Sequence, residues 1–286
     1  MPDVTSVIHD IGYQRYAGVR LGRRYVVASL YTHGLRTAFG LGRSAKAKIF
    51  PWFLVGVVGI VAAVVAAIRA QTGQIVLSYG QLPQTLTMVI IFLCAATAPE
   101  LVSRDLHTGV LPLYFSRPVR RSDYPLAKLA AMVSALFLTL GGAQLLMFLV
   151  AVFTVDGVSD IWGELDDFLK GWAYSAIFAM VFGSVAILVS SLMGRRAIAA
   201  GVTVGAFLVT TPVVGVLSVM PNTTVNQLAG LASPISLVSG IGDWLFEPLG
   251  ESMSGDYGPV YAVVAVALIA GCVALLLARY RKVASA

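Results

Sequence analysis

The stretch LAAMVSALFLTLGGAQLLMFLVAVFTV, residues 129–155, holds 27 consecutive residues without a charged side chain. About 20 apolar residues suffice for a helix to cross a bilayer, and one charged residue at its centre costs about 2.5 to 3.5 kcal/mol. The stretch therefore predicts a membrane-spanning helix.

Similar intervals lie on both sides of it. Three are each long enough for one span: 20 uncharged residues at 49–68, 24 at 171–194 and 22 at 257–278. The interval before Glu100 begins with polar residues, so we predict its span from Pro83 to about Ala98. The interval after Arg196 predicts a span from about Ala197 to Val219. Its Thr210-Thr211-Pro212 predicts a kink near the outer half, because proline cannot donate the backbone hydrogen bond of a helix interior.

The remaining segment, about 220–258, is rich in Pro, Asn, Thr, Gly and Ser. That composition suits short re-entrant or interfacial helices in an external loop more than a further crossing.

Composition agrees with a polytopic membrane protein. The chain has 286 residues, of which 58% are hydrophobic and 12% charged, and a mean hydropathy of +0.84. Ordinary soluble domains carry about 25% charged residues, so a soluble enzyme, a nucleic-acid-binding domain and a disordered tail are excluded. We expect an all-α fold with six transmembrane helices. Cys94 and Cys272 lie in apolar runs and are interpreted as packing thiols.

The charges predict how the chain is oriented. Eighteen of the 20 Lys and Arg residues fall in segments that six spans place on one side, and nine of the 14 acidic residues fall on the other. Lys and Arg collect on the cytoplasmic side of membrane proteins, so both termini are expected in the cytoplasm. We therefore divide the chain into a cytoplasmic arm and helix (1–48), a transmembrane domain (49–280) and a cytoplasmic tail (281–286). The net charge of +6 then requires no nucleic-acid partner.

The N-terminal arm contains an amphipathic pattern over residues 25–39. The apolar side holds Val27, Leu30, Tyr31, Leu35, Ala38 and Phe39, and the polar side holds Ser29, Thr32, Arg36 and Arg43. This predicts a helix along the inner membrane surface. Two interpretations stay open: a lipid anchor alone, or a helix that rests on lipid and presents basic side chains to a cytosolic partner.

The loop after the second span, about 103–125, is too apolar for a plain solvated loop. Leu106, Val110, Leu111 and Leu113 could form one face of a short helix, and a basic corner, Ser116-Arg117-Pro118-Val119-Arg120-Arg121, follows them. Such an element could dock into a groove on a soluble protein. The alternative is an interfacial helix bounded by arginines.

Here the sequence resembles the permease subunits of type-two ABC exporters, the ABC-2 permeases, which are related to the G-subfamily of ABC transporters. The resembling residues are Glu100, Gly109, Leu111 and Leu113, then residues 116–121 and Lys128. Val110 after the glycine and Ala127 before the lysine depart from the family's Gly-Thr-Leu and Gly-Lys. The motif covers about thirty residues, and the layout of six spans with an N-terminal amphipathic helix and a long last external loop is similar over nearly the whole chain.

The resemblance implies a coupling helix within residues 103–113 that contacts a nucleotide-binding subunit. Its residues are Ser103, Arg104, Leu106, His107, Gly109, Leu111 and Leu113. The chain has no G-x-x-x-x-G-K-[ST] phosphate loop, since the nearest stretch, residues 40–46, lacks that spacing. We therefore expect a separate ATPase to bind ATP and Mg, and expect no catalytic residues, cofactor or metal site in this chain. His9, His33 and His107 are scattered.

Glu100 and Arg104 are four residues apart, so an ion pair on one helical face is expected if the second span continues. Our hypothesis is that this charged cluster, together with an arginine of the N-terminal helix, fixes the angle between that helix, the second span and the coupling helix. The alternative is an ordinary interfacial pair.

Two features of the spans bear on mechanism. The third to sixth predicted spans contain no Asp, Glu, Lys, Arg or His, which disfavours an ion-driven carrier. Ala197, Gly201 and Gly205 form a small-residue stripe that permits close helix contact. It predicts either packing within the chain or a homodimer interface, and the resemblance favours a second permease copy.

These observations predict the permease subunit of an ATP-driven exporter, with membrane lipid, an ABC ATPase and a second permease copy as partners. Arg outnumbers Lys 15 to 5, which points to a GC-rich bacterial gene and hence to the bacterial inner membrane. The alternatives are a subunit that transmits force to a partner protein without passing cargo, and a secondary carrier or channel. The class of cargo stays open.

Overall fold

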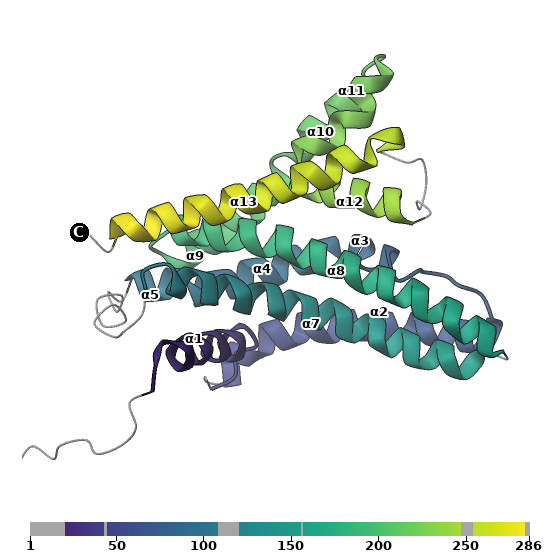
Figure 1. The fold of residues 1–286 in the computed structure, drawn as a ribbon, viewed down its shortest axis with the longest axis horizontal. Coiled ribbons are helices and arrows are strands. Elements are labelled where there is room, and N and C mark those ends of the chain that lie inside the picture. Colours follow the sequence, from purple (N-terminus) through teal and green to yellow (C-terminus); the bar gives the residue numbers. More distant parts are fainter. Residues whose placement is uncertain (1–20, 43–44, 108–119, 156, 247–253, 284–286) are drawn as a thin grey trace, which may run out of the picture.

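The computed structural model describes residues 21–42, 45–107, 120–155, 157–246 and 254–283. Within these ranges the regular structure is helical throughout (Figure 1). Six helical stretches are long and apolar enough to cross a membrane: Ala47–Thr72, Thr87–Asp105, Asp123–Thr154, Ser159–Leu192, Arg196–Ser218 and Gly255–Lys282. The predicted all-α fold with six spans is therefore confirmed.

The helices have these bounds in chain order: α1 Arg23–Ala38, α2 Ala45–Thr72, α3 Gln81–Thr85, α4 Thr87–Leu101, α5 Ser103–His107, α7 Asp123–Thr154, α8 Val158–Leu192, α9 Arg196–Leu208, α10 Thr211–Ser218, α11 Thr223–Leu228, α12 Pro234–Leu245 and α13 Gly258–Val283, with 3-10 turns η1 Ala229–Ala232 and η2 Gly255–Tyr257. Gly40, at a positive φ of 66°, forms the tight turn from α1 to α2, where an added Cβ would meet the Ala47 backbone.

Helix α7 lies at the centre of one half of the bundle, packed against α1, α2 and α8. Helix α4 packs against α8 and α9, and α13 lies across α8 and α12. A stack of phenylalanine rings fills the centre between α8 and α9: the centroids of Phe178 and Phe182 are 4.1 Å apart, and those of Phe182 and Phe207 are 4.7 Å apart. Aromatic rings give this contact its large buried area.

The predicted kink in the fifth span is confirmed. Helix α9 ends at Leu208 and α10 begins at Thr211, and the Thr210 hydroxyl donates to the Phe207 carbonyl at 3.2 Å. Beyond it, the pair of helical segments Thr223–Ala232 and Pro234–Leu245 is bent by 120°, the geometry of a re-entrant loop or a broken span. This agrees with the short helices predicted for the last external segment.

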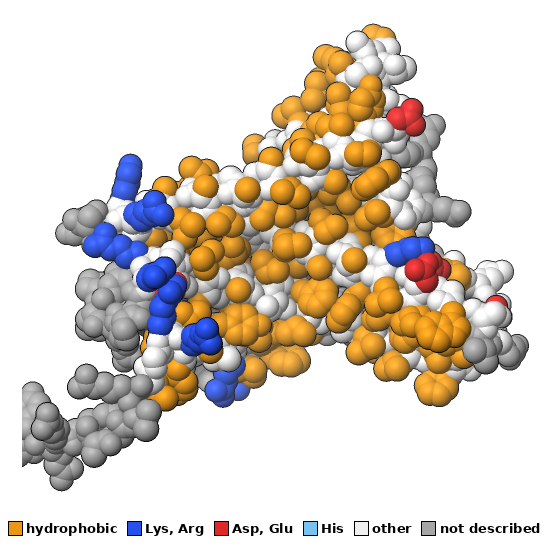
Figure 2. Space-filling view, in the orientation of Figure 1, with side chains coloured by type: hydrophobic (Ala, Val, Ile, Leu, Met, Phe, Trp, Pro, Cys, Tyr) orange, Lys and Arg blue, Asp and Glu red, His pale blue; other side chains and the backbone are white. Residues whose placement is uncertain are grey.

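Charged side chains mark the two ends of the bundle. Figure 2 shows Lys and Arg gathered at the end where α1, α5 and the end of α13 lie, and most visible Asp and Glu toward the opposite end. This is the distribution that the positive-inside count predicted along the sequence.

The acidic residues Glu164, Asp166 and Asp167 lie near the start of α8, which continues without a break into the fourth span. One local prediction needs correction. Helix α1 was expected to rest its apolar face on lipid. Instead it packs against α7 and α4: Leu30 is buried, and Tyr31 donates a hydrogen bond to Ser134 of α7 at 3.0 Å.

Candidate functional site

The segment predicted to couple to an ATPase begins directly at the end of the second span. Only Val102 separates α4 from α5, and its φ of −127° and ψ of −54° break the helix. Ser103 is 1% exposed, and its hydroxyl donates to the Ser190 carbonyl of α8 at 2.7 Å. The prediction that Ser103 contacts a partner is thus corrected, since the buried side chain fixes the start of α5 to α8.

Asp105 anchors α5 to the third span. Its carboxylate lies 2.9 Å from the Lys128 ammonium and accepts a hydrogen bond from the Tyr124 hydroxyl at 2.7 Å. The Lys128 side chain is 2% exposed, and its ammonium lies 5.4 Å from the centroid of the Tyr124 ring. The ring of Tyr124 contacts that of Tyr280 in α13, with centroids 5.4 Å apart. Four side chains thus connect α5, α7 and α13.

A second pair joins α1 to the start of α7. Arg23 binds both carboxylate oxygens of Asp123, at 2.6 and 2.5 Å, and Asp123 also accepts from the Arg120 backbone N–H at 3.0 Å. The arginine side chain is 45% exposed, so solvent weakens this pair more than the buried Lys128–Asp105 pair.

Glu100 forms an ion pair with Arg196, the first residue of α9. The carboxylate side chain is 6% exposed and the arginine side chain is 62% exposed. This contact joins the end of α4 to the start of α9. The sequence predicted Arg104 and an arginine of the N-terminal helix as partners of Glu100; Arg196 is a partner that it did not indicate.

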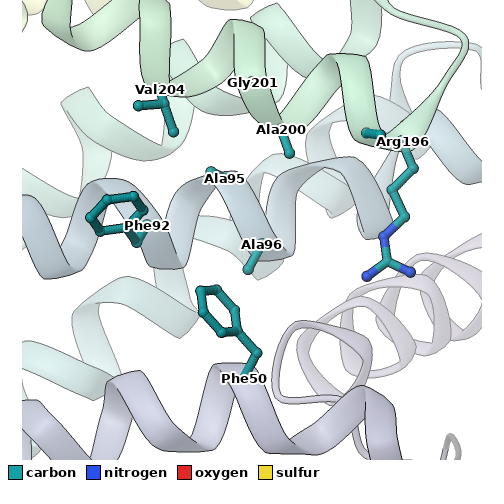
Figure 3. A pocket seen from close by; sticks show the side chains of 9 residues that line it. Phe50, Phe92, Ala95, Ala96, Arg196, Ala200, Gly201 and Val204 are labelled. Atoms are coloured by element: carbon teal, nitrogen blue, oxygen red, sulfur yellow. The ribbon is translucent and has the colours of Figure 1, made fainter.

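A groove lies beside this pair, between α2, α4 and α9 (Figure 3). It encloses about 460 Å³ and is lined by Phe50, Phe92, Ala95, Ala96, Arg196, Ala197, Ala200, Gly201 and Val204. Except for Arg196 at one end, the lining side chains are apolar. A groove of this size falls in the range of about 300 to 1,000 Å³ typical of small-molecule sites.

The predicted small-residue stripe lies on the open side of α9. Ala197, Gly201 and Gly205 are exposed, and a Cβ added at Gly201 or Gly205 would meet nothing within 4 Å. The alternative of packing within the chain therefore fails for both glycines in the described part of the structure. Ala197 and Gly201 instead help to line the groove.

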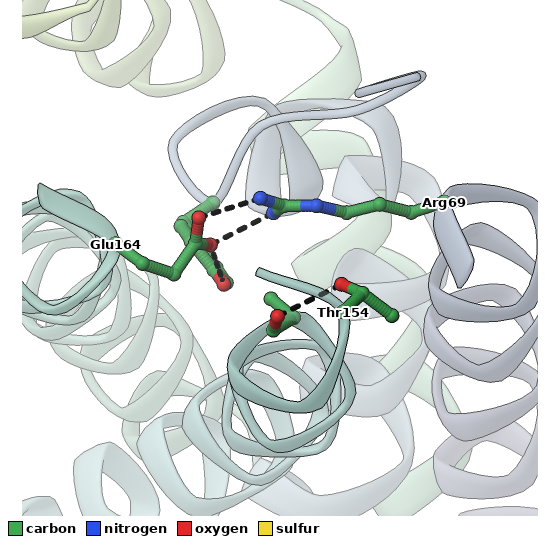
Figure 4. A network of polar contacts seen from close by, with 5 residues as sticks. Arg69, Thr154 and Glu164 are labelled. Carbon is green, nitrogen blue, oxygen red and sulfur yellow. Dashed lines mark hydrogen bonds and ion pairs between the residues drawn. The ribbon is translucent and has the colours of Figure 1, made fainter. Parts of the chain in front are cut away.

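The opposite end of the bundle holds a buried polar network (Figure 4). Arg69 of α2 donates to both oxygens of Glu164 in α8, at 2.8 and 2.5 Å, and the Tyr79 hydroxyl also donates to Glu164. Burial and the Glu164 carboxylate raise the pKa of Tyr79, so its hydroxyl stays a donor at neutral pH. Gln144 of α7 donates to the Tyr79 carbonyl at 2.7 Å. These contacts hold the segment after α2 against α7 and α8.

The other predicted site residues are placed as follows. Arg104 is exposed, and the backbones of Leu106 and His107 belong to α5, but their side chains lie outside the described part of the structure. Gly109, Leu111 and Leu113 also lie outside it. On α1, Tyr31, Leu35 and Phe39 are partly buried against the core and Arg36 is exposed.

The described residues give no sign of a metal centre, since no group of three or more His, Cys, Asp or Glu side chains among them could hold an ion. The contacts of this site are ion pairs, hydrogen bonds and ring contacts between helices. Such contacts hold the neighbouring helices in fixed relative positions.

The comparisons with known proteins agree with this architecture. The profile of the ABC-2 family transporter proteins matches residues 25–283, from α1 to the end of α13. A comparison with curated proteins gave no match. Because the family profile covers nearly all of the chain, this multi-pass membrane protein belongs to the ABC-2 family of transporter proteins.

Proposed function

We propose that the chain is the transmembrane permease subunit of an ATP-driven exporter in the bacterial inner membrane, with both termini in the cytoplasm. A separate ABC ATPase subunit binds ATP and Mg and moves the segment that begins at α5. Family membership supports the transport role, and the Lys and Arg residues gathered at the end with α1 and α5 support the orientation.

One observation carries the proposal: α4 forms a wall of the apolar groove and ends one residue before α5. A displacement of α5 therefore changes the position of α4 relative to α9, and with it the width of the groove. This gives a route from an ATPase on the cytoplasmic side to the membrane-facing groove. Alternation between two groove widths is a conformational equilibrium that ATP binding biases.

The lining of the groove defines the class of cargo. Phe50, Phe92 and Val204 with small side chains from α4 and α9 offer apolar contacts, and Arg196 is the one charged lining residue. An apolar or amphiphilic molecule that enters from the bilayer fits these walls. The exposed stripe of Ala197, Gly201 and Gly205 faces the second permease copy, which closes the open side.

The test is transport by the reconstituted complex. The chain and its ATPase are placed in liposomes, and ATP-dependent movement of a set of fluorescent amphiphiles is followed. Ala200→Trp fills the groove and is expected to abolish movement while the ATPase stays bound, whereas Gly59→Trp on α2, where an added Cβ meets nothing within 4 Å, is expected to keep it. Movement of the amphiphiles without the ATPase would contradict the proposal and favour a carrier or channel.

A second candidate is a force-transmitting subunit that passes no cargo. Helix α10 projects away from the bundle in Figure 1, and some of its apolar residues are exposed: Val213 by 50% and Val216 by 62%, with Val219 just after it by 81%. Such a surface could bind an external protein. This candidate predicts an external protein that cross-links to α10 and ATP hydrolysis without export of any tested amphiphile.

A further inference from the structure

Lys128 is a buried cation on the third span, in the second turn of α7. Its side chain is only 2% exposed. A charge removed from water requires a closely placed counter-charge, because an unpaired buried charge is strongly destabilising. Asp105, at 2.9 Å, supplies it.

The counter-charge belongs to α5, the element closest in sequence to the predicted ATPase contact. The backbone of α5 packs against α4, α8 and α9. The Asp105–Lys128 pair adds a side-chain connection to α7, and the Tyr124 hydroxyl bound to the same carboxylate strengthens it. A short ion pair with an added hydrogen bond is hard to break in a dry environment, so α5 and the start of α7 are held together during a movement.

The connection extends to the sixth span. Tyr124 is 0% exposed and its ring lies against Tyr280, which is 1% exposed. Close-packed rings transmit a displacement because interiors are nearly incompressible. The Arg23–Asp123 pair, with its half-exposed arginine, ties α1 to the same end of α7.

We propose that Lys128 and Asp105 are positioning residues that make α5, α7 and α13 move as one unit when the ATPase displaces α5. This proposal rests on the proposed function and extends it, because it assigns the transmission of force to the third and sixth spans, α7 and α13, as well as to α4. Helix α4, which forms a wall of the groove, then moves in the same step as α7 and α13.

The first experiment separates a link from a simple structural contact. The chain with Lys128→Met, and the double variant Lys128→Met with Asp105→Asn, are co-purified with the ATPase and placed in lipid nanodiscs. The single variant leaves a buried carboxylate and is expected to melt at a lower temperature; the double variant removes both charges and is expected to regain most of that loss. If the pair is a link, both bind the ATPase normally, and permease-stimulated ATP hydrolysis falls about tenfold in both.

The matched control is the pair Lys170–Asp166 on α8, whose side chains are 55% and 62% exposed. Lys170→Met with Asp166→Asn is expected to leave stimulation at the wild-type level. A double variant of Lys128 and Asp105 that regains its melting temperature and also keeps wild-type stimulation would overturn the proposal. A wild-type chain that neither binds nor stimulates the ATPase would instead overturn the proposed function itself.

A second measurement follows the movement in a chain that keeps the link. Spin labels are attached at Leu126→Cys in α7 and Leu275→Cys in α13, two exposed positions away from the predicted ATPase contact, after replacement of Cys94 and Cys272 by alanine. The distance between the labels is expected to change by less than about 2 Å when ATP is added to the complex, the scale of small helix shifts. A larger change with Asp105 and Lys128 intact would contradict a common movement of α7 and α13.

Discussion

At the scale of single residues, ion pairs join helices at both ends of the bundle. Glu100 with Arg196 and Asp105 with Lys128 lie toward the end that we propose to be cytoplasmic, and Glu164 with Arg69 lies at the other. Each carboxylate is largely buried. Separating such a pair would leave a buried charge without a counter-charge, which is strongly destabilising. These pairs therefore hold together the helices that carry them.

Replacement of Arg196 by methionine tests the contact between the second and fifth spans. The Glu100 side chain is 6% exposed and loses a cation, which destabilises the fold. Because the arginine side chain is 62% exposed and partly screened, we expect a loss of about 1 to 2 kcal/mol, below the range for a fully buried pair. Thermal unfolding in detergent measures it. The exposed neighbour Arg195→Met is the control; an equal effect of both variants would contradict a specific role of the Glu100 contact.

Replacement of Tyr79 by phenylalanine tests the network at the other end. The ring stays packed against Phe168, at 5.8 Å between centroids, while the hydrogen bond to the buried Glu164 is lost. Arg69 still donates to both carboxylate oxygens, so we expect only the loss of one hydrogen bond to a charged group, about 1.5 to 3 kcal/mol. Thermal unfolding again reports the change, with the exposed Tyr25→Phe as the control. An unchanged melting temperature would mean that Arg69 alone satisfies the carboxylate.

At the scale of elements, the contact of α1 with α7 depends on the absence of a side chain at Gly34. A Cβ added there would lie 2.9 Å from the Cβ of Ala131. Gly34→Leu is therefore expected to push α1 away from α7, with an overpacking cost of about 1 to 3 kcal/mol that the better helix propensity of leucine, about 1 kcal/mol, offsets in part. Gly59→Leu on α2 meets open space and is the control for thermal unfolding. Equal melting temperatures would show that α1 does not depend on this contact.

The proposed second copy is expected to meet the first through the open side of α9. Because nothing lies within 4 Å of a Cβ added at Gly205, Gly205→Leu is expected to leave the melting temperature of the protomer unchanged. A bulky side chain prevents the close helix approach that small residues allow, so the dimer is expected to dissociate. Native mass spectrometry of the detergent-solubilised chain measures this, with Gly56→Leu on α2 as the control. A dimer that survives Gly205→Leu would place the interface elsewhere.

The sequence predicted elements better than contacts. Charge-free intervals located the spans because a charge at mid-membrane is costly, and Pro212 located the break between α9 and α10. The apolar side of residues 25–39 was visible as well, but periodicity cannot distinguish lipid from a neighbouring helix as its partner. The structure shows that the partner is protein, because Leu30 is buried where α1 packs against α7 and α4.

At the scale of the whole molecule, the partners of the ionisable residues could not be read from the sequence. Arg196 reaches Glu100, and Lys128 reaches Asp105, only because α4, α5, α7 and α9 converge at one end of the bundle. The local rule that pairs residues four apart on a helix indicated Arg104 for Glu100 and gave no indication of Arg196. In the sequence Lys128 only marks the charged boundary before the third span, and its burial, which requires a counter-charge, is visible only in the structure.

Helix α5 lies at the end of the bundle where Lys and Arg gather (Figure 2), and it directly follows α4, which forms a wall of the groove. This arrangement supports a permease that receives movement from a separate ATPase. We propose that the segment after Val102 contacts that ATPase and that the apolar side chains of Leu106 and Leu111 make the contact.

Co-purification tests this claim most directly. The tagged chain is co-expressed with the ABC ATPase encoded beside its gene, and the wild type is compared with Leu106→Glu/Leu111→Glu in detergent and in lipid. The control is Leu21→Glu/Leu41→Glu, which adds the same charges at exposed positions. We predict that the wild type and the control retain the ATPase with its activity and that the Leu106/Leu111 variant loses it. A folded wild-type chain that retains no ATPase, or a Leu106/Leu111 variant that retains it as well as the wild type, would contradict the account.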